Sequence, residues 1–227
     1  MNWISARLGL TVCSPVIMKV QWLLLTAHYQ CVGKITDTEL DICYYKAAAQ
    51  YAGGDIEGAL ATYQAMIDYD EENGNAYYLH GCLSLKQQDT DTAKKDFANA
   101  VKYNPDDYEL YVGIYENLAG NNMTEEGEEY LNKAFDIKGN SAEDLTWRGR
   151  IYYLLGQYDN AVKELEGAVK KDSAKANLYL AQVYEAEEDS ANAEKYYQAY
   201  VDSGTADSVA MNALAEIQME KGTMKRR

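Results

Sequence analysis

Proline, histidine and phenylalanine are scarce in this chain of 227 residues, which contains two of each. Because an interior proline costs a helix about 3 kcal/mol, so little proline permits helix along almost the whole chain. Two histidines leave little material for acid–base catalysis. His28 lies near the N-terminus, and His80 falls beside core positions of a predicted helix, so we interpret His80 as a packing residue rather than a catalytic base.

Signals for other chemistry are also missing. The sequence contains neither a G-x-S-x-G nucleophile motif nor a phosphate-binding loop. Its four cysteines, Cys13, Cys31, Cys43 and Cys82, show no C-x-x-C spacing, which makes zinc binding improbable. We therefore expect no enzymatic activity, no metal and no cofactor, and we expect Cys43 and Cys82 to be free thiols.

Acidic residues are absent from the first 36 positions, although the whole chain has a formal net charge of −15 at pH 7. A negative field of this size repels phosphate backbones, which argues against general nucleic-acid binding. Basic residues gather only in the tail, residues 222–227, which we expect to be a solvated chain end.

Residues 1–35 form an apolar, acid-free leader. Its two uncharged stretches, 8–18 and 20–33, are shorter than the roughly 18–20 residues of a membrane-spanning helix. A basic, apolar start is typical of export signals, and Cys31 is a candidate for lipidation as in bacterial lipoproteins, although the residues before it are not small. Two interpretations stay open: an exported or membrane-anchored protein, or a disordered or loosely docked leader on a cytoplasmic one.

What the sequence does contain is a repeat of 34 residues, in which a small residue is followed four positions later by a large apolar one. The pairs are Ala59/Tyr63, Ala93/Phe97, Gly127/Leu131 and Ala161/Leu165, and a fifth pair, Ala193/Tyr197, follows after 32 residues. A period of this length is typical of a solenoid built from helical hairpins. The sequence thus predicts an all-α fold that offers an extended surface rather than a single pocket.

The residue types explain the repeat. Numbered from 1 to 34, four of the five repeats have small residues at positions 8 and 20, where two antiparallel helices can approach closely. A large residue at position 24 fills the space one turn on. The small pairs are Ala47/Ala59, Gly81/Ala93, Gly149/Ala161 and Ala181/Ala193.

These phased copies closely resemble the tetratricopeptide repeat family, whose pattern is W-x2-L-G-x2-Y, then A-x3-F, then P. The resemblance implies a right-handed α-solenoid of five hairpins, at 40–73, 74–107, 108–141, 142–173 and 174–207. A capping box at Thr36 and Glu39 predicts that the first helix begins at Thr36, so the repeat domain spans 36–207. Residues 208–221 are predicted to form a capping helix with Asn212, Glu216 and Glu220 on its outer side.

The third repeat has two possible registers. In strict phase, Tyr115 occupies position 8, where a small residue is expected, and Gly127 at position 20 compensates for its size. In the alternative, Gly113 takes position 8 and the loop at 120–122 absorbs two extra residues. We favour compensation, because Tyr111, Ile114 and Tyr115 keep helical spacing.

The family also implies where a partner would bind. Its groove is lined by the first helix of each repeat, near positions 2, 5, 9, 12 and 13. The candidate binding residues are Tyr44, Ala48, Tyr51, Tyr78, Cys82, Leu85, Val112, Glu116, Arg150, Tyr153, Lys175 and Gln182.

Chaperone-binding members of the family clamp a partner's carboxylate with lysines, arginines and asparagines at positions 5 and 9 of successive repeats. Here Arg150 is the single basic residue at these positions, so the clamp is absent and that role is disfavoured. The chain has 21 tyrosines, which suit a half-exposed groove. We expect an interaction scaffold that binds an apolar or aromatic-anchored peptide or helix, with Arg150 and Lys175 meeting acidic groups. The alternative is an exported or membrane-anchored envelope assembly factor. The oligomeric state stays open.

Overall fold

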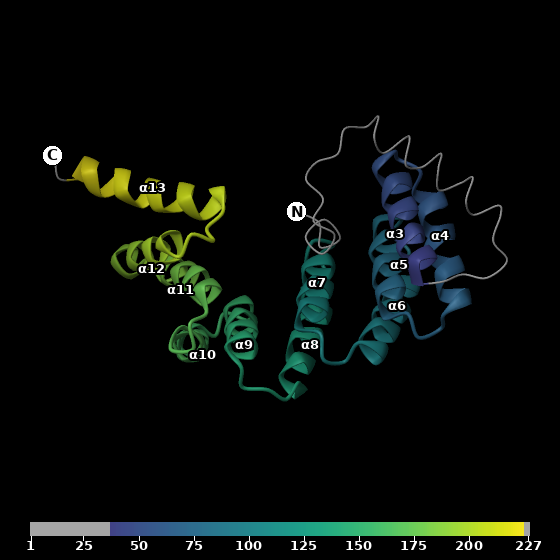
Figure 1. The fold of residues 1–227 in the computed structure, drawn as a ribbon, viewed down its shortest axis with the longest axis horizontal. Helices are drawn as coiled ribbons and strands as arrows, with labels where there is room; N and C mark the ends of the chain where they lie inside the picture. Colours follow the sequence, from purple (N-terminus) through teal and green to yellow (C-terminus); the bar gives the residue numbers. More distant parts are fainter. Residues whose placement is uncertain (1–36, 225–227) are drawn as a thin grey trace. The chain divides into compact units, whose positions relative to one another are not determined.

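The computed structural model describes residues 37–224, which contain α-helices, one short 3-10 helix and no strand (Figure 1). The described part confirms the all-α fold of helical hairpins. Residues 1–35 with Cys31, the predicted cap Thr36, and residues 225–227 lie outside it. The chain divides into two compact units, one ending at Asn104 and the other beginning at Pro105.

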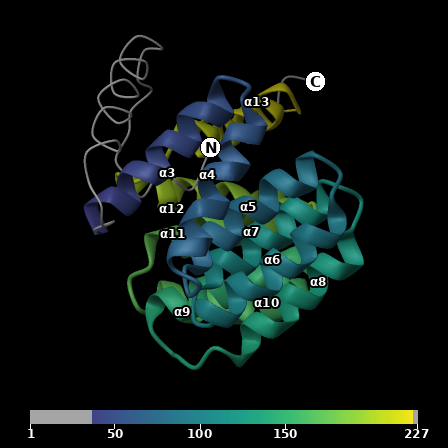
Figure 2. The same ribbon diagram turned by 90° about the vertical axis from the view of Figure 1, so that its right-hand side faces the viewer.

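Unit 1 contains two helical hairpins. Their helices are α3 (Asp37–Ala52), α4 (Ile56–Tyr69), α5 (Gly74–Lys86) and α6 (Thr90–Tyr103). Consecutive helices pack against each other, and Figure 2 shows α3 and α4 side by side.

Unit 2 contains three further hairpins and a last, unpaired helix. Its elements are α7 (Tyr108–Ala119), α8 (Thr124–Lys133), the 3-10 helix η1 (Ala134–Asp136), α9 (Ala142–Leu154), α10 (Tyr158–Val169), α11 (Ala174–Ala186), α12 (Ser190–Asp202) and α13 (Ser208–Met224). The helix α13 continues past the predicted end at residue 221, because Gly222 does not interrupt it.

The turn inside each hairpin recurs at the same spacing as the small residues. One residue in each turn adopts a left-handed backbone conformation with φ between 60° and 84°. These residues are Gly54, Gln88, Asn122, Gly156 and Glu188, which keep the spacing of the repeat. Two of the turns therefore use glycine, which adopts this conformation without strain, and three use polar residues instead.

The second helices begin at side-chain caps in three of the five hairpins. Asp55, Asp89 and Asp189 each accept hydrogen bonds from backbone N–H groups of the following turn. Such caps satisfy donors that have no partner within the helix. They start α4, α6 and α12 at equivalent points of their repeats.

Small residues hold the two helices of each hairpin together, as their spacing predicts. The alanines at positions 8 and 20 are fully buried: Ala47, Ala59, Ala93, Ala161, Ala181 and Ala193. At Gly149 a Cβ atom would lie 2.4 Å from Leu165 Cγ, closer than real side chains approach. The position-8 residue is therefore in direct contact with the large residue at position 24.

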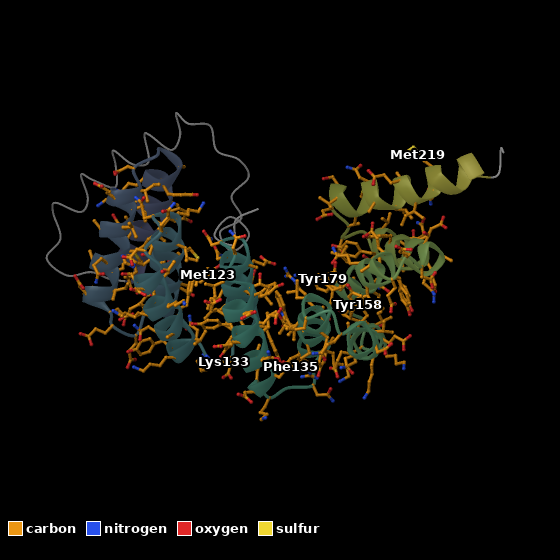
Figure 3. All side chains as sticks on the ribbon, turned by 180° about the vertical axis from the view of Figure 1, so that it is seen from behind. Met123, Lys133, Phe135, Tyr158, Tyr179 and Met219 are labelled. Carbon is orange, nitrogen blue, oxygen red and sulfur yellow. The ribbon has the colours of Figure 1, made fainter. Side chains whose placement is uncertain are left out.

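The third repeat uses the compensating register. A Cβ atom at Gly127 would lie 3.0 Å from Tyr115 Cδ2 and 3.3 Å from Tyr115 Cα, so the tyrosine rests on the glycine. This hairpin is also irregular at its end, where η1 replaces the last turn of α8. The ring of Phe135 in η1 packs against Tyr152 of α9 at a centroid distance of 4.6 Å, which links this repeat to the next. Figure 3 labels Phe135 at this junction.

His80 is a structural residue, as expected. Its Nδ1 lies 2.6 Å from Oδ2 of Asp96, and both side chains are buried between α5 and α6. A buried polar pair of this kind satisfies both groups and fixes the register of the hairpin.

We predict that Gly149→Ala lowers the free energy of unfolding by about 1–3 kcal/mol, because the methyl group overlaps buried Leu165. The matched control is Gly167→Ala on α10, where a Cβ atom would lie 3.4 Å from Leu145, an ordinary contact. The control should raise stability by up to about 1 kcal/mol through helix propensity alone. Urea unfolding followed by circular dichroism measures both, and equal effects would contradict the proposed packing.

We also predict that stability falls as the pH rises above about 10. Burial raises the pKa of Tyr63 and of Tyr197 above the ordinary value of 10.0, and the hydroxyl of Tyr197 also donates to Glu185. Unfolded tyrosine ionises near pH 10 while the folded rings stay neutral, so the stabilisation is complete below pH 10 and shrinks above it. Urea titrations at pH 8 and 11 measure the loss in the free energy of unfolding. Tyr63→Phe should make this loss smaller. An equal loss in the wild type and the variant would contradict the assignment.

Candidate interaction surface

The predicted tyrosines of unit 1 are half-buried and already engaged within the unit. The hydroxyl of Tyr44 donates to Oδ1 of Asn73 at 2.6 Å, and its ring lies 6.3 Å from that of Tyr63. The ring of Tyr78 lies 6.2 Å from that of Phe97. Each of these rings thus connects two helices, with only part of its surface available to a ligand.

Tyr51 forms a bridge between the two hairpins of unit 1. Lys86 at the end of α5 donates to the hydroxyl of Tyr51 on α3, and its Nζ lies 4.9 Å from the centroid of that ring. A cation over an aromatic face is attracted by the ring electrons. Lys86 is exposed and occupies position 13 of its repeat, one of the groove positions of the family pattern.

Cys82 and Ala48 are half-buried on the first helices of unit 1. Burial raises the pKa of the Cys82 thiol to about 12. The thiol therefore stays protonated near neutral pH and is a poor nucleophile and a poor metal ligand. Neither Cys43 nor Cys82 forms a disulfide bond in the structure.

Two predicted surface residues have to be corrected. Leu85 and Val112 are each only 2% exposed, so their side chains belong to the core and do not line a groove. The repeat period identifies equivalent positions, but whether a neighbouring helix covers a given position depends on local packing.

In unit 2, Arg150 ties together the first helices of three repeats. Its Nη2 donates to Oε1 of Glu116 on α7 at 2.6 Å, and its Nη1 donates to the hydroxyl of Tyr179 on α11 at 3.2 Å. Charge-assisted hydrogen bonds of this type are stronger than neutral ones. The predicted residues Glu116 and Arg150 therefore lie together, from α7 and α9.

Aromatic rings complete this site. The Arg150 guanidinium carbon lies 5.4 Å from the ring centroid of Trp147 and 5.4 Å from that of Tyr179. Nζ of Lys175 lies 5.1 Å from the centroid of the Trp147 ring, so two cationic side chains lie near the indole. We name Trp147, Arg150, Lys175 and Tyr179 the basic-aromatic cluster; Figure 3 labels Tyr179 within it.

The members of the basic-aromatic cluster differ in how accessible their side chains are to a ligand. Lys175 is exposed, Trp147 and Arg150 are half-buried, and Tyr179 is buried. Burial is the main cause that raises the pKa of Tyr179, so its hydroxyl stays neutral. Glu116 accepts from Arg150, and the charges of Glu116 and Glu109 both act on Tyr179, so the cluster combines two cations with nearby carboxylates.

The remaining predicted residues lie on the same two first helices. Tyr153 on α9 is half-buried, with its ring 6.1 Å from that of Tyr158 on α10, and Gln182 on α11 is half-buried. Trp147 and Tyr179 were missed, because position 6 is not a groove position in the family pattern. The sequence did contain a signal for Trp147, because it is the only tryptophan within the repeats.

Two further findings concern residues 37–224 alone. None of their helices combines the length and apolarity that a membrane span requires. Nor do three His, Cys, Asp or Glu side chains gather there as a ligand set for a metal ion.

Comparison with known sequences points to one family. Two profiles described as tetratricopeptide repeat match residues 74–107 and 148–208, which correspond to the second hairpin of unit 1 and the last two hairpins of unit 2. A comparison with curated proteins finds no match.

Three solved structures share the fold at low sequence identity. A thermophilic TPR protein of Thermus thermophilus has a TM-score of 0.51 and 21% identity, covering 76% of this chain and 95% of its own. A tetratricopeptide repeat protein from Parabacteroides merdae has a TM-score of 0.58 and 17% identity, covering 94% and 80%. Yeast Tom70 has a TM-score of 0.63 and 16% identity, covering 92% of this chain and 47% of its own.

The profile matches, the hairpin packing and the shared fold agree with one another. The chain is a tetratricopeptide repeat protein.

Proposed function

We propose that this protein is a scaffold that binds a segment of another protein on the first helices of its hairpins and carries out no catalysis. Stacked hairpins form extended surfaces rather than a single enclosed pocket, and such surfaces suit polypeptide partners. The observation that carries the proposal is the basic-aromatic cluster, where side chains from α9 and α11 meet.

The cluster favours a partner segment in which an acidic residue stands next to an apolar or aromatic one. Lys175 is exposed and is held near the Trp147 face, so its charge is available to a carboxylate while the indole offers apolar area. Arginine, tryptophan and tyrosine are the residue types that most often dominate binding energy at interfaces.

The cluster is also preorganised. Arg150 is held by Glu116 and Tyr179 at once, so a ligand does not have to immobilise this long side chain when it binds. Less conformational entropy is then lost on association, which raises the affinity for a given set of contacts.

In unit 1, Tyr51 and Lys86 supply a second, smaller cation–aromatic surface of the same kind. The rings of Tyr44 and Tyr78 lie against Tyr63 and Phe97 on the second helices of their hairpins. Replacing these two tyrosines would disturb the core together with the surface, so they are poor probes of binding.

We predict that a photo-crosslinking residue placed at Lys175 captures partner polypeptides, whereas one placed at Lys163 on α10 does not. Both lysines are exposed, but only Lys175 belongs to the cluster. Mass spectrometry of the adducts identifies the partner. Lys175→Glu should then weaken binding about tenfold or more by repelling the acidic segment, with Lys163→Glu as control. Capture at Lys163 alone would place binding on the second helices.

A second candidate role, envelope assembly by an exported or membrane-anchored protein, rests on the acid-free sequence of residues 1–35. We predict that in this case the native protein lacks Met1 and carries either a new N-terminus or a lipid on Cys31. Mass spectrometry of the N-terminal peptide from the natural host measures this. An intact, unmodified N-terminal segment would refute the second role and leave the scaffold proposal in place.

A further inference from the structure

The last helix, α13, has one covered side and one open side. It packs on α12 through Ala210, Leu214 and Ile217, which are all buried. Its open side presents Met211 and Met219, which are 49% and 63% exposed. Asn212 and Glu216, two of the residues predicted to lie on the outer side, are exposed as well. Figure 3 labels Met219 on the side of α13 that faces away from α12.

The open side is uncharged as far as residue 219. At 3.6 residues per turn, one arc of about 120° on α13 carries an uninterrupted set of neutral residues. These are Met211, Asn212, Ala215, Gln218 and Met219, and all five are exposed. Glu216 falls outside the arc. In a chain with a formal net charge of −15, a neutral exposed face is unusual.

This face is also symmetric in sequence about Ala215. Met211 and Met219 lie four residues on either side of it, and Asn212 and Gln218 lie three residues on either side. Two such helices in antiparallel orientation, related by a twofold axis at Ala215, place methionine opposite methionine and amide opposite amide. A symmetric dimer requires such self-complementarity.

We propose that two copies of this chain associate through the uncharged face of α13, antiparallel, with Ala215 of each copy at the twofold axis. Ala215 occupies position 8 of its repeat, where Gly81, Gly149 and Ala181 receive a second helix within their own hairpins. A helix of the second copy takes that place. The small side chain permits close approach, and the flexible methionines fill the space beside it.

The size and charge of the interface predict its strength. A single pair of helices buries less than the roughly 1,600 Å² of a standard stable interface, so the dimer is in exchange with monomer at micromolar concentrations. Because both copies are acidic, screening by salt strengthens the association.

Sedimentation equilibrium of the full chain at several concentrations tests association. The wild-type protein should dimerise, and Ala215→Glu should weaken the dimer about tenfold or more, because two carboxylates would meet at the axis. The matched control, Ala199→Glu, places the same charge at an exposed position of α12 and should leave the dimer unchanged. Circular dichroism verifies that both variants stay folded. A monomeric wild type, or equal effects of the two variants, would overturn the proposal.

Disulfide crosslinking tests the geometry independently of any loss of folding. Under mild oxidation, Ala215→Cys should form a disulfide between two copies of the introduced cysteine. The single variants Met211→Cys and Met219→Cys should crosslink poorly, whereas their double variant should crosslink well, because antiparallel pairing brings position 211 to position 219. Wild-type protein treated in parallel reports the background from native cysteines. Efficient crosslinking of both single variants would indicate parallel pairing and refute the antiparallel arrangement.

Discussion

The close contact between a small residue on one helix and a large residue on the next is the interaction on which each hairpin depends. Gly149 against Leu165 shows it most directly, since no room remains even for a methyl group. Close packing of this kind makes the two helices of a hairpin a rigid unit. The third repeat satisfies the same constraint in reverse, with Tyr115 resting on Gly127.

Rigid hairpins place their first helices so that side chains from successive repeats can meet. Arg150 uses this placement, because its guanidinium reaches Glu116 on α7 and Tyr179 on α11 at once. Arg150 therefore stabilises the stacking of three repeats, and its positive charge lies near the exposed Lys175. The proposed binding surface therefore keeps its geometry through contacts within the chain.

The end of the array follows the same packing rule. A first helix always has one side for the preceding repeat and another for its own second helix. In α13 the first side is buried on α12, while Met211 and Met219 remain exposed on the other. The unsatisfied contact of a hairpin is thus the physical origin of the proposed association surface.

The all-α hairpin fold and the irregular third repeat could both be predicted from the amino-acid sequence. The prediction was possible because helix packing requires small residues at fixed intervals, and the 34-residue period displays them. The repeat positions of Glu116, Arg150 and Lys175 predict one shared surface. In the structure Arg150 donates to Glu116, and Arg150 and Lys175 both lie over the Trp147 ring. The burial of Leu85 and Val112 became clear only from the packed helices, as did the place of Trp147 and Tyr179 in the cluster. Burial and contact depend on which neighbouring helix covers a position, and a repeat pattern records equivalence between positions but not their surroundings.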